Sequence, residues 1–148
     1  MIKVLPEAEI WEVVDSCAHA HLGCYANGKS YVVPVSFVRD GNRIFGLTSA
    51  GLKIDMMREN PKVCLQFEEI TSLTMWRSAI LWGQFQELEG AERAQAAGAM
   101  FDKYGPGFEG TELRKGRDVT PPRLDHTPSP QIAYAITISE FSGRSEGS

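Results

Sequence analysis

Apolar residues recur along the chain with two different periods, and the changes of period mark the predicted elements. Between residues 7 and 17 they recur every three or four positions, which predicts a helix with one apolar face. Pro6 suits the first turn of that helix, because the amide hydrogen that proline lacks has no partner there. The alanine-rich residues 90–104 and a short segment after Gly51 also predict helices.

Six segments carry the alternation of apolar and polar positions, or the apolar runs, that are typical of strands. They are residues 19–25, 30–38, 43–48, 62–68, 76–88 and 132–138. Asn27-Gly28 predicts a hairpin turn between the first two, because a type I′ turn needs positive φ at both positions. Strands at such short spacing, with helices between them, predict a mainly β fold with accessory helices. We expect a six-stranded antiparallel barrel, since closing the sheet removes exposed strand edges.

Residues 105–130 have a different composition, because five of the eight prolines and four glycines lie there. This composition predicts a long loop, and a connection of that length inside a domain is usually functional or disordered. We expect it to pack near a ligand site, with a loose surface excursion as an equal alternative. The polar tail after Gly143 is expected to fray. Residues 1–148 are predicted to form a single domain.

Charge and cysteine content exclude several classes of protein. Fifteen basic and nineteen acidic residues leave a net charge of −4, and the lack of a basic block argues against a nucleic-acid partner. No apolar run approaches the ~18 residues of a membrane-spanning helix. Cys17, Cys24 and Cys64 form no CxxC pair, so neither a disulfide framework nor a zinc ribbon is expected. The expected compartment is a reducing cytoplasm.

The segment Thr48-Ser49-Ala50-Gly51-Leu52-Lys53 joins a predicted strand to a predicted helix. The first amides of a helix lack partners, and here two hydroxyls and a lysine accompany them, which suits a phosphate group. The alternative is that Ser49 is only an N-cap and Lys53 lies on a solvated face. Spacing alone favours that alternative by about two to one, because N-caps are common.

The strand at residues 31–37 is apolar on both faces, yet Pro34 lies in its middle. Proline cannot donate to a β-ladder, so it is confined to edge strands and bulges. A flat apolar ligand fits along such a strand and meets peptide groups that are not used in pairing. An ordinary edge strand explains the pattern equally well.

The long strand at residues 76–88 offers two largely apolar faces. One face carries Trp76, Ser78, Ile80 and Trp82, and the other carries Arg77, Ala79, Leu81 and Phe85. One face is expected to fill the barrel and the other to form a subunit interface. Arg77 and Ser78 also suit an anion site, since a guanidinium matches phosphate oxygens, although a lone arginine is more often a surface residue.

Two histidines, His19 and His21, lie two positions apart on one predicted strand. No carboxylate or cysteine stands nearby at a ligand-like spacing, so a metal site has about one chance in ten and none is predicted.

The order and spacing of these segments resemble the FMN-binding split-barrel family, which includes the pyridoxamine 5′-phosphate oxidases. The nearest branch is the nitroimidazole-resistance (Nim-type) flavoproteins. The similarity covers about residues 7–144, and no single motif in it is strong. The matching segments are His21-Leu22-Gly23, then residues 27–37, 44–46, 48–53, 60–64, 76–83, 136–138 and 142–144.

The resemblance implies a split β-barrel that forms a homodimer, with two FMN molecules at the subunit interface. It implies an FMN-dependent oxidoreductase acting on a small molecule, with no nucleic acid or membrane as partner. The implied isoalloxazine site is the strand Val33, Pro34, Val35 and Ser36. The implied phosphate site is Thr48, Ser49 and Lys53, with Trp76, Arg77 and Ser78 close by.

Two departures from the family pattern bear on the reaction. The arginine-rich phosphate strand and the Arg-x-His element of true pyridoxamine 5′-phosphate oxidases are absent, which argues against pyridoxal phosphate synthesis. No acid or base residue is singled out. The alternative function is a flavin- or haem-binding protein without turnover of its own, with His19, His21 or His126 as haem ligands.

Overall fold

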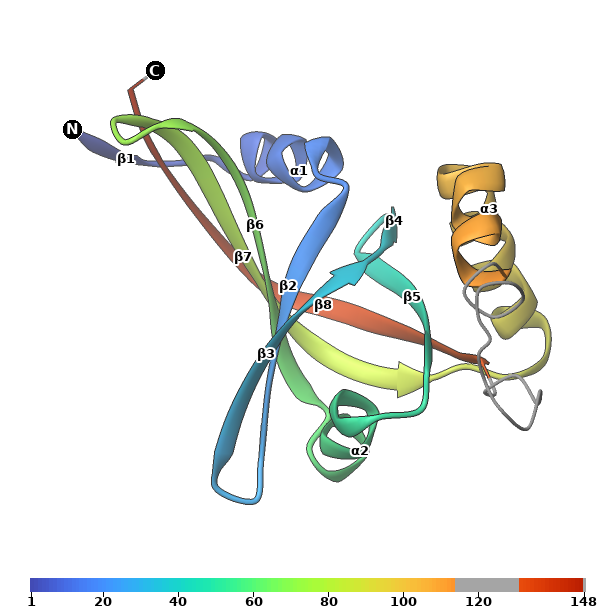
Figure 1. Ribbon diagram of the computed structural model, residues 1–148. Coiled ribbons are helices and arrows are strands. Elements are labelled where there is room, and N and C mark those ends of the chain that lie inside the picture. The colour runs from blue at the N-terminus through green and yellow to red at the C-terminus, as the bar shows by residue number, and fades with distance from the viewer. Residues whose placement is uncertain (114–130, 148) are drawn as a thin grey trace.

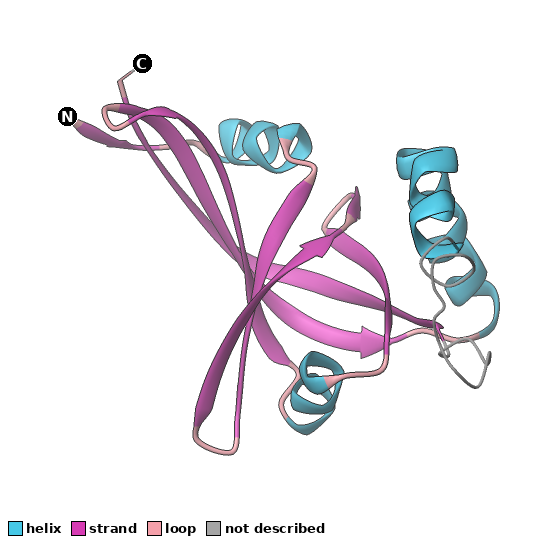
Figure 2. Cartoon of the chain, in the orientation of Figure 1, coloured by secondary structure: helices cyan, strands magenta, loops and turns pink. Residues whose placement is uncertain are grey.

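The described residues form one strongly curved antiparallel sheet with helices around it (Figure 1, Figure 2). The computed structural model describes residues 1–113 and 131–147. The strands are β1 (Ile2–Val4), β2 (His19–Ala26), β3 (Lys29–Ser36), β4 (Val38–Asp40), β5 (Arg43–Ser49), β6 (Lys62–Ser72), β7 (Met75–Glu87) and β8 (Gln131–Glu146). The helices are α1 (Glu7–Ser16), α2 (Leu52–Glu59) and α3 (Gly90–Leu113).

The sheet curves into a barrel because its two end strands are consecutive in the chain. The strand order is β3-β2-β6-β7-β8-β5-β4, with β1 added to β8. Only Phe37 separates β3 from β4, so the first and last strands of this path must meet at that residue. Figure 1 shows β3 running into β4 beside β5. The predicted antiparallel barrel is therefore confirmed.

The β2–β3 hairpin has the predicted turn. Asn27 has φ 53° and Gly28 has φ 76°, which are the two positive values that a type I′ turn requires. The pairing runs without interruption from His19 opposite Ser36 to Ala26 opposite Lys29. This turn fixes which side chains of β3 point into the barrel.

The barrel interior is filled by the apolar positions of the alternating strands. In β6, Val63, Leu65 and Phe67 are buried and the residues between them face outward, as the alternation predicts. Helix α1 packs against β6, β7 and β8, and α2 packs against β2. Helix α3 lies outside β5 and β8, where Ala96 belongs to a second small apolar cluster with Phe45 and Leu88.

Three details differ from the sequence predictions. The described residues form eight strands rather than six, because β1 and β4 are three-residue strands too short to show alternation. The tail does not fray at Gly143, since β8 continues to Glu146 and pairs with both β1 and β7. Residues 105–113, predicted as loop, belong to α3, which continues past a break at Gly105. The rest of the predicted loop lies outside the described residues.

Candidate functional site

Helix α2 begins without a side-chain cap. Its N-cap residue is Gly51, in extended backbone, and no described side chain caps the first amides of the helix. Ser49 is exposed and lies two residues too early to serve as the cap, so the N-cap alternative for Ser49 is wrong. The first amides of α2 are therefore left open to an outside acceptor, and the dipole of the helix favours an anion there.

Lys53 stands in the first turn of α2 and is partly buried. Burial lowers the pKa of its amine, and the nearby Cys24 thiol acts in the opposite direction. Lys53 forms no ion pair with any carboxylate among residues 1–105 and 132–147, the residues whose side chains the structure describes. A partly desolvated cation without a counter-ion is unfavourable, and a bound anion would relieve that cost.

Two strand edges near α2 remain unpaired in the described part of the chain. β3 pairs only with β2, so its other edge is free, as expected of a strand that carries Pro34. One edge of β5 pairs with β8 along its whole length. The other edge pairs with β4 only at residues 43–45, which leaves that edge of residues 46–49 free. The strands β3 and β5 contact each other. We call these two edges, residues 31–36 and 46–49, the seam.

The seam brings together two of the predicted site segments. Thr48 and Ser49 end β5, and α2 with Lys53 follows three residues after the strand. Lys53 lies near Cys24, which pairs with Tyr31 of β3. The predicted phosphate residues therefore lie at one end of the seam. The predicted isoalloxazine strand forms one of its sides.

The residues of that strand divide between the two faces of the sheet. Val35 is buried and Val33 packs against the core, so both point into the barrel. Pro34 is exposed and Ser36 is partly exposed, on the outer face. A planar ligand at this strand would meet Pro34 and Ser36 by their side chains, and Val33 and Val35 by their peptide groups.

Trp76, Arg77 and Ser78 lie apart from Lys53 within the chain. Cys24, which is near Lys53, lies opposite Val63 of β6, because its neighbour Gly23 pairs with Cys64. Ser78 pairs with Glu68, further along the same strand. Five residues of strand separate Val63 from Glu68, which is about 17 Å. Ser78 is nevertheless linked to residues level with Pro34. His21 pairs with both Pro34 and Gln66, and the Gln66 amide donates to Ser78 Oγ at 3.2 Å. Trp76 donates to Glu146 at 3.1 Å.

Arg77 points to the opposite face from Ser78 and is bound by two carboxylates. Its Nε and Nη2 donate to both oxygens of Glu69 at 3.0 and 3.1 Å, and its Nη1 donates to Glu12 at 3.2 Å. The Arg77 hydrogen bonds lower the pKa of the Glu69 carboxyl. The guanidinium is thus bound by carboxylates of α1 and β6, and its part in a phosphate site stays a prediction.

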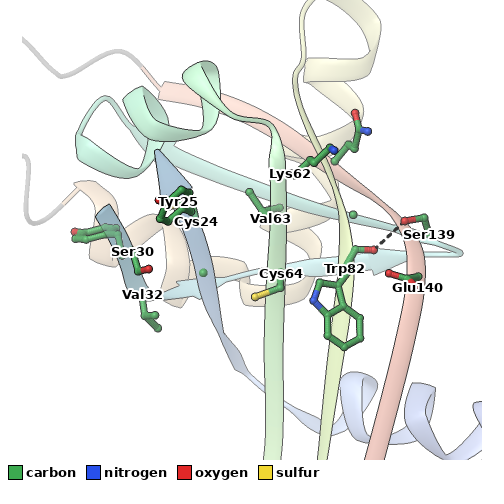
Figure 3. Close-up of a pocket in the computed structure, with 14 residues that line it drawn as sticks. Cys24, Tyr25, Ser30, Val32, Lys62, Val63, Cys64, Trp82, Ser139 and Glu140 are labelled. Atoms are coloured by element: carbon green, nitrogen blue, oxygen red, sulfur yellow. Dashed lines mark hydrogen bonds between the residues drawn. The ribbon is translucent and has the colours of Figure 1, made fainter. Parts of the chain in front are cut away.

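A groove crosses the outer face of β3, β2, β6, β7 and β8, with a volume of about 610 Å³. In Figure 3 the Trp82 ring and the Cys64 thiol stand on its floor, and Val32 lies on the strand at its far side. Trp82 is 38% exposed and Val32 is 68% exposed, so this face is apolar and uncovered among the described residues. None of the ten predicted site residues lines the groove. The alternation of β7 placed Trp82 on one of two apolar faces, either of which was a candidate subunit interface, but no pattern marked Cys64.

His19 and His21 both face outward and are exposed. The Nδ1 atom of His21 lies 3.3 Å from the Gln66 amide oxygen, and His21 is directly opposite Pro34. The two histidines therefore belong to the outer face beside the seam.

An antiparallel barrel that is open along one seam is a split barrel. The chain belongs to the pyridoxamine 5′-phosphate oxidase family, whose model matches residues 6–145. The predicted family resemblance and fold class are thereby confirmed. In the described residues no helix is long and apolar enough to cross a membrane.

Several solved structures share the fold. A FAD-binding protein from Mesorhizobium loti has a TM-score of 0.79 at 23% identity, covering 100% of this chain and 98% of that one. A proposed 5-nitroimidazole antibiotic resistance protein from Bacteroides thetaiotaomicron has a TM-score of 0.72 at 16% identity, covering 98% and 87%. A flavocytochrome from Azotobacter vinelandii has a TM-score of 0.71 at 22% identity, covering 99% and 70%.

The chain is also similar in sequence to part of a curated relative. An uncharacterized protein from Rhizobium meliloti is 38% identical over 87 residues, which is 59% of this chain and 58% of that protein. The match therefore spans little more than half the length of that relative.

Proposed function

We propose that the protein binds FMN and acts as a flavin-dependent oxidoreductase on a small molecule. The observation that carries the proposal is Lys53, a partly buried cation at an uncapped helix start that has no carboxylate partner among the described side chains. A phosphate monoester supplies the missing negative charge and acceptors for the open amides of α2. Thr48 and Ser49 add hydroxyls at the same end of the seam.

The seam also suits the rest of a flavin. The free edge of β3 offers amide and carbonyl groups to the polar rim of an isoalloxazine, and Pro34 and Ser36 offer it a flat surface. Trp76 and Ser78 extend the site across the outer face. A bound flavin supplies hydride and single-electron chemistry, while the protein holds and orients it. Family membership supports this assignment, as do relatives whose names state FAD binding.

A titration with FMN and FAD tests the proposal directly. We expect FMN to bind to the purified protein with quenching of its fluorescence and a shift of its visible bands. One lysine and one helix start make a single anion site, so we expect FMN to bind more tightly than FAD. Absence of binding of either flavin at about 100 µM, where a ΔG of binding near −5.5 kcal/mol would still be seen, overturns the proposal.

A homodimer is the second part of the proposal. The outer face exposes Trp82 and Val32 around a groove, and exposed apolar surface of this kind usually marks an interface. A second copy would cover it and exclude water from the seam. Sedimentation should give a mass near twice 16.4 kDa at micromolar concentration. A monomer under those conditions contradicts this part.

The alternative is a flavin- or haem-binding protein without its own turnover. Two observations support this alternative. The fold is shared with a flavocytochrome, and His19 and His21 are exposed on the outer face. An intense Soret band in the purified protein would support haem, whereas flavin bands alone would remove that alternative. A cytoplasmic location stays a prediction, in keeping with three free cysteines.

A further inference from the structure

Phe37 lies where the barrel closes, and its peptide groups are not part of a β-ladder. It is the one residue between β3 and β4, and it is 1% exposed. Its ring packs edge-on against Phe67 with centroids 5.1 Å apart. A buried peptide without partners is costly, so the groups that satisfy Phe37 matter for the closure.

Two residues of α3 satisfy the Phe37 peptide. The Phe37 amide donates to the Tyr104 hydroxyl oxygen at 3.1 Å. That hydroxyl lies 2.9 Å from the Phe37 carbonyl and 2.8 Å from the Ala18 carbonyl, and it donates to one of them at a time. The Lys103 amine donates to the Phe37 carbonyl at 2.8 Å and stands 3.9 Å from the centre of the Phe37 ring.

These contacts hold a helix against the end of the strand that borders the seam. Burial raises the pKa of the Tyr104 phenol, while hydrogen bonding with the Phe37 backbone and the Ser36 side chain acts in the opposite direction. Regular helical backbone ends directly after Tyr104, because Gly105 has φ 60°. The two side chains therefore leave α3 from the last residues before its break.

We propose that Tyr104 and Lys103 are positioning residues that fix Ser36 and Phe37, and with them the width of the seam. The inference rests on the proposed flavin function and names what holds its site in place. Among the described strands β3 pairs only with β2, so its end has no ladder on the seam side there. Without the Tyr104 hydroxyl, the Phe37 amide loses its acceptor, and the strand end must move to reach another.

Tyr104→Phe tests this role, because it keeps the ring and removes the hydroxyl. We expect FMN affinity to fall about two- to tenfold, which corresponds to the loss of one net hydrogen bond. The visible circular dichroism of the bound flavin should also change, since it reports the orientation of the ring. Asp102→Asn is the matched control, an exposed neighbour on α3, and should leave both readouts unchanged.

Hydrogen exchange provides a readout that does not depend on flavin. In Tyr104→Phe the amides of Phe37 and Ser36 should exchange at least about fivefold faster than in the parent protein, because protection follows local hydrogen bonding. If exchange is faster in Tyr104→Phe but the parent protein binds no flavin, the proposed function is overturned. The role of Tyr104 in holding Phe37 is then still supported. A lowered melting temperature with unchanged affinity, dichroism and exchange would show a purely structural contact and overturn the inference. Lys103→Met removes the donor to the Phe37 carbonyl, so it should likewise weaken FMN binding, change the dichroism and speed exchange.

Discussion

The surroundings of α1 and the start of α2 differ in how their cations are neutralised. Around α1, Arg77 is bound by Glu69 and Glu12, and Arg39 is bound through Nε and Nη2 by Asp15 at 2.7 and 2.8 Å. At the start of α2, Lys53 has no carboxylate partner among the described residues. The first arrangement fastens a helix to the sheet, whereas the second leaves a positive charge for a ligand.

This comparison distinguishes structural from ligand-binding cations without reference to sequence motifs. Both regions hold partly buried cations, so burial alone does not separate them. The counter-ion does, because a cation already bound by two carboxylates gains little from a phosphate. Three predictions test or refine the comparison, beginning with the one of largest effect.

Lys53→Ala should weaken FMN binding about ten- to a hundredfold. A charge-assisted hydrogen bond to a phosphate dianion contributes ~1.5–3 kcal/mol, and this variant removes it. Stability without FMN should not fall, since the partly buried amine has no carboxylate partner in the part of the chain that the structure describes. The measurement is an FMN titration beside Lys3→Ala, an exposed lysine on β1 that should bind FMN like the parent protein. Equal affinity in the two variants would make Lys53 a surface residue and place the phosphate elsewhere.

Glu69→Gln should affect stability rather than binding. The pKa of Glu69 is lowered by Arg77 and by a hydrogen bond from Ser16, so the folded state prefers the charged carboxylate. Its contribution is present above the pKa of the unfolded chain, near 4.3, and is lost as the pH falls through the lower folded value. Solvent screening limits it to about 1 kcal/mol.

Denaturant unfolding between pH 7 and pH 3 measures this contribution. At pH 7 the variant should be less stable than the parent by about that amount, and the difference should shrink below pH 4. FMN affinity should stay within about twofold of the parent value. A larger loss of affinity would mean that the Arg77 pair supports the flavin site after all, and the distinction between the two regions would fail.

Much of the fold could be predicted from the sequence because it depends on local patterns. The alternation of Val63, Leu65 and Phe67 determined a strand, and Asn27-Gly28 determined a turn. The closure at Phe37 could not be predicted, since residues 30–38 have the pattern of one continuous strand and nothing in the sequence marks a break at Phe37. The pairing of the terminal residues with β1 depends on contacts between the two ends of the chain, which no local pattern contains.

The candidate site was predictable to a smaller extent. Alternation placed Arg77 and Ser78 on opposite faces of β7, and the structure agrees. The partners of Arg77 could not be foreseen, because Glu12 is 65 positions away and becomes a neighbour only through packing of α1. The lack of a side-chain cap on α2 could not be predicted either, because it depends on the exact residue at which the helix begins. A shift of two residues separates a capping Ser49 from the Gly51 that occupies the position.

Gly51→Ser should give the smallest effect, and it tests the open amides of α2. Serine caps a helix start slightly better than glycine, so stability without FMN should rise by ~0.3 kcal/mol. Gly51 has extended backbone with no atom within 4 Å of an added Cβ, so serine fits without strain. The new hydroxyl would compete with the phosphate for the same amides, and FMN affinity should fall about twofold. Ala50→Ser, which adds a hydroxyl one residue before the cap position, should change neither quantity. A gain in stability with unchanged affinity would show that the phosphate does not use these amides, and Lys53 would then bind it without them.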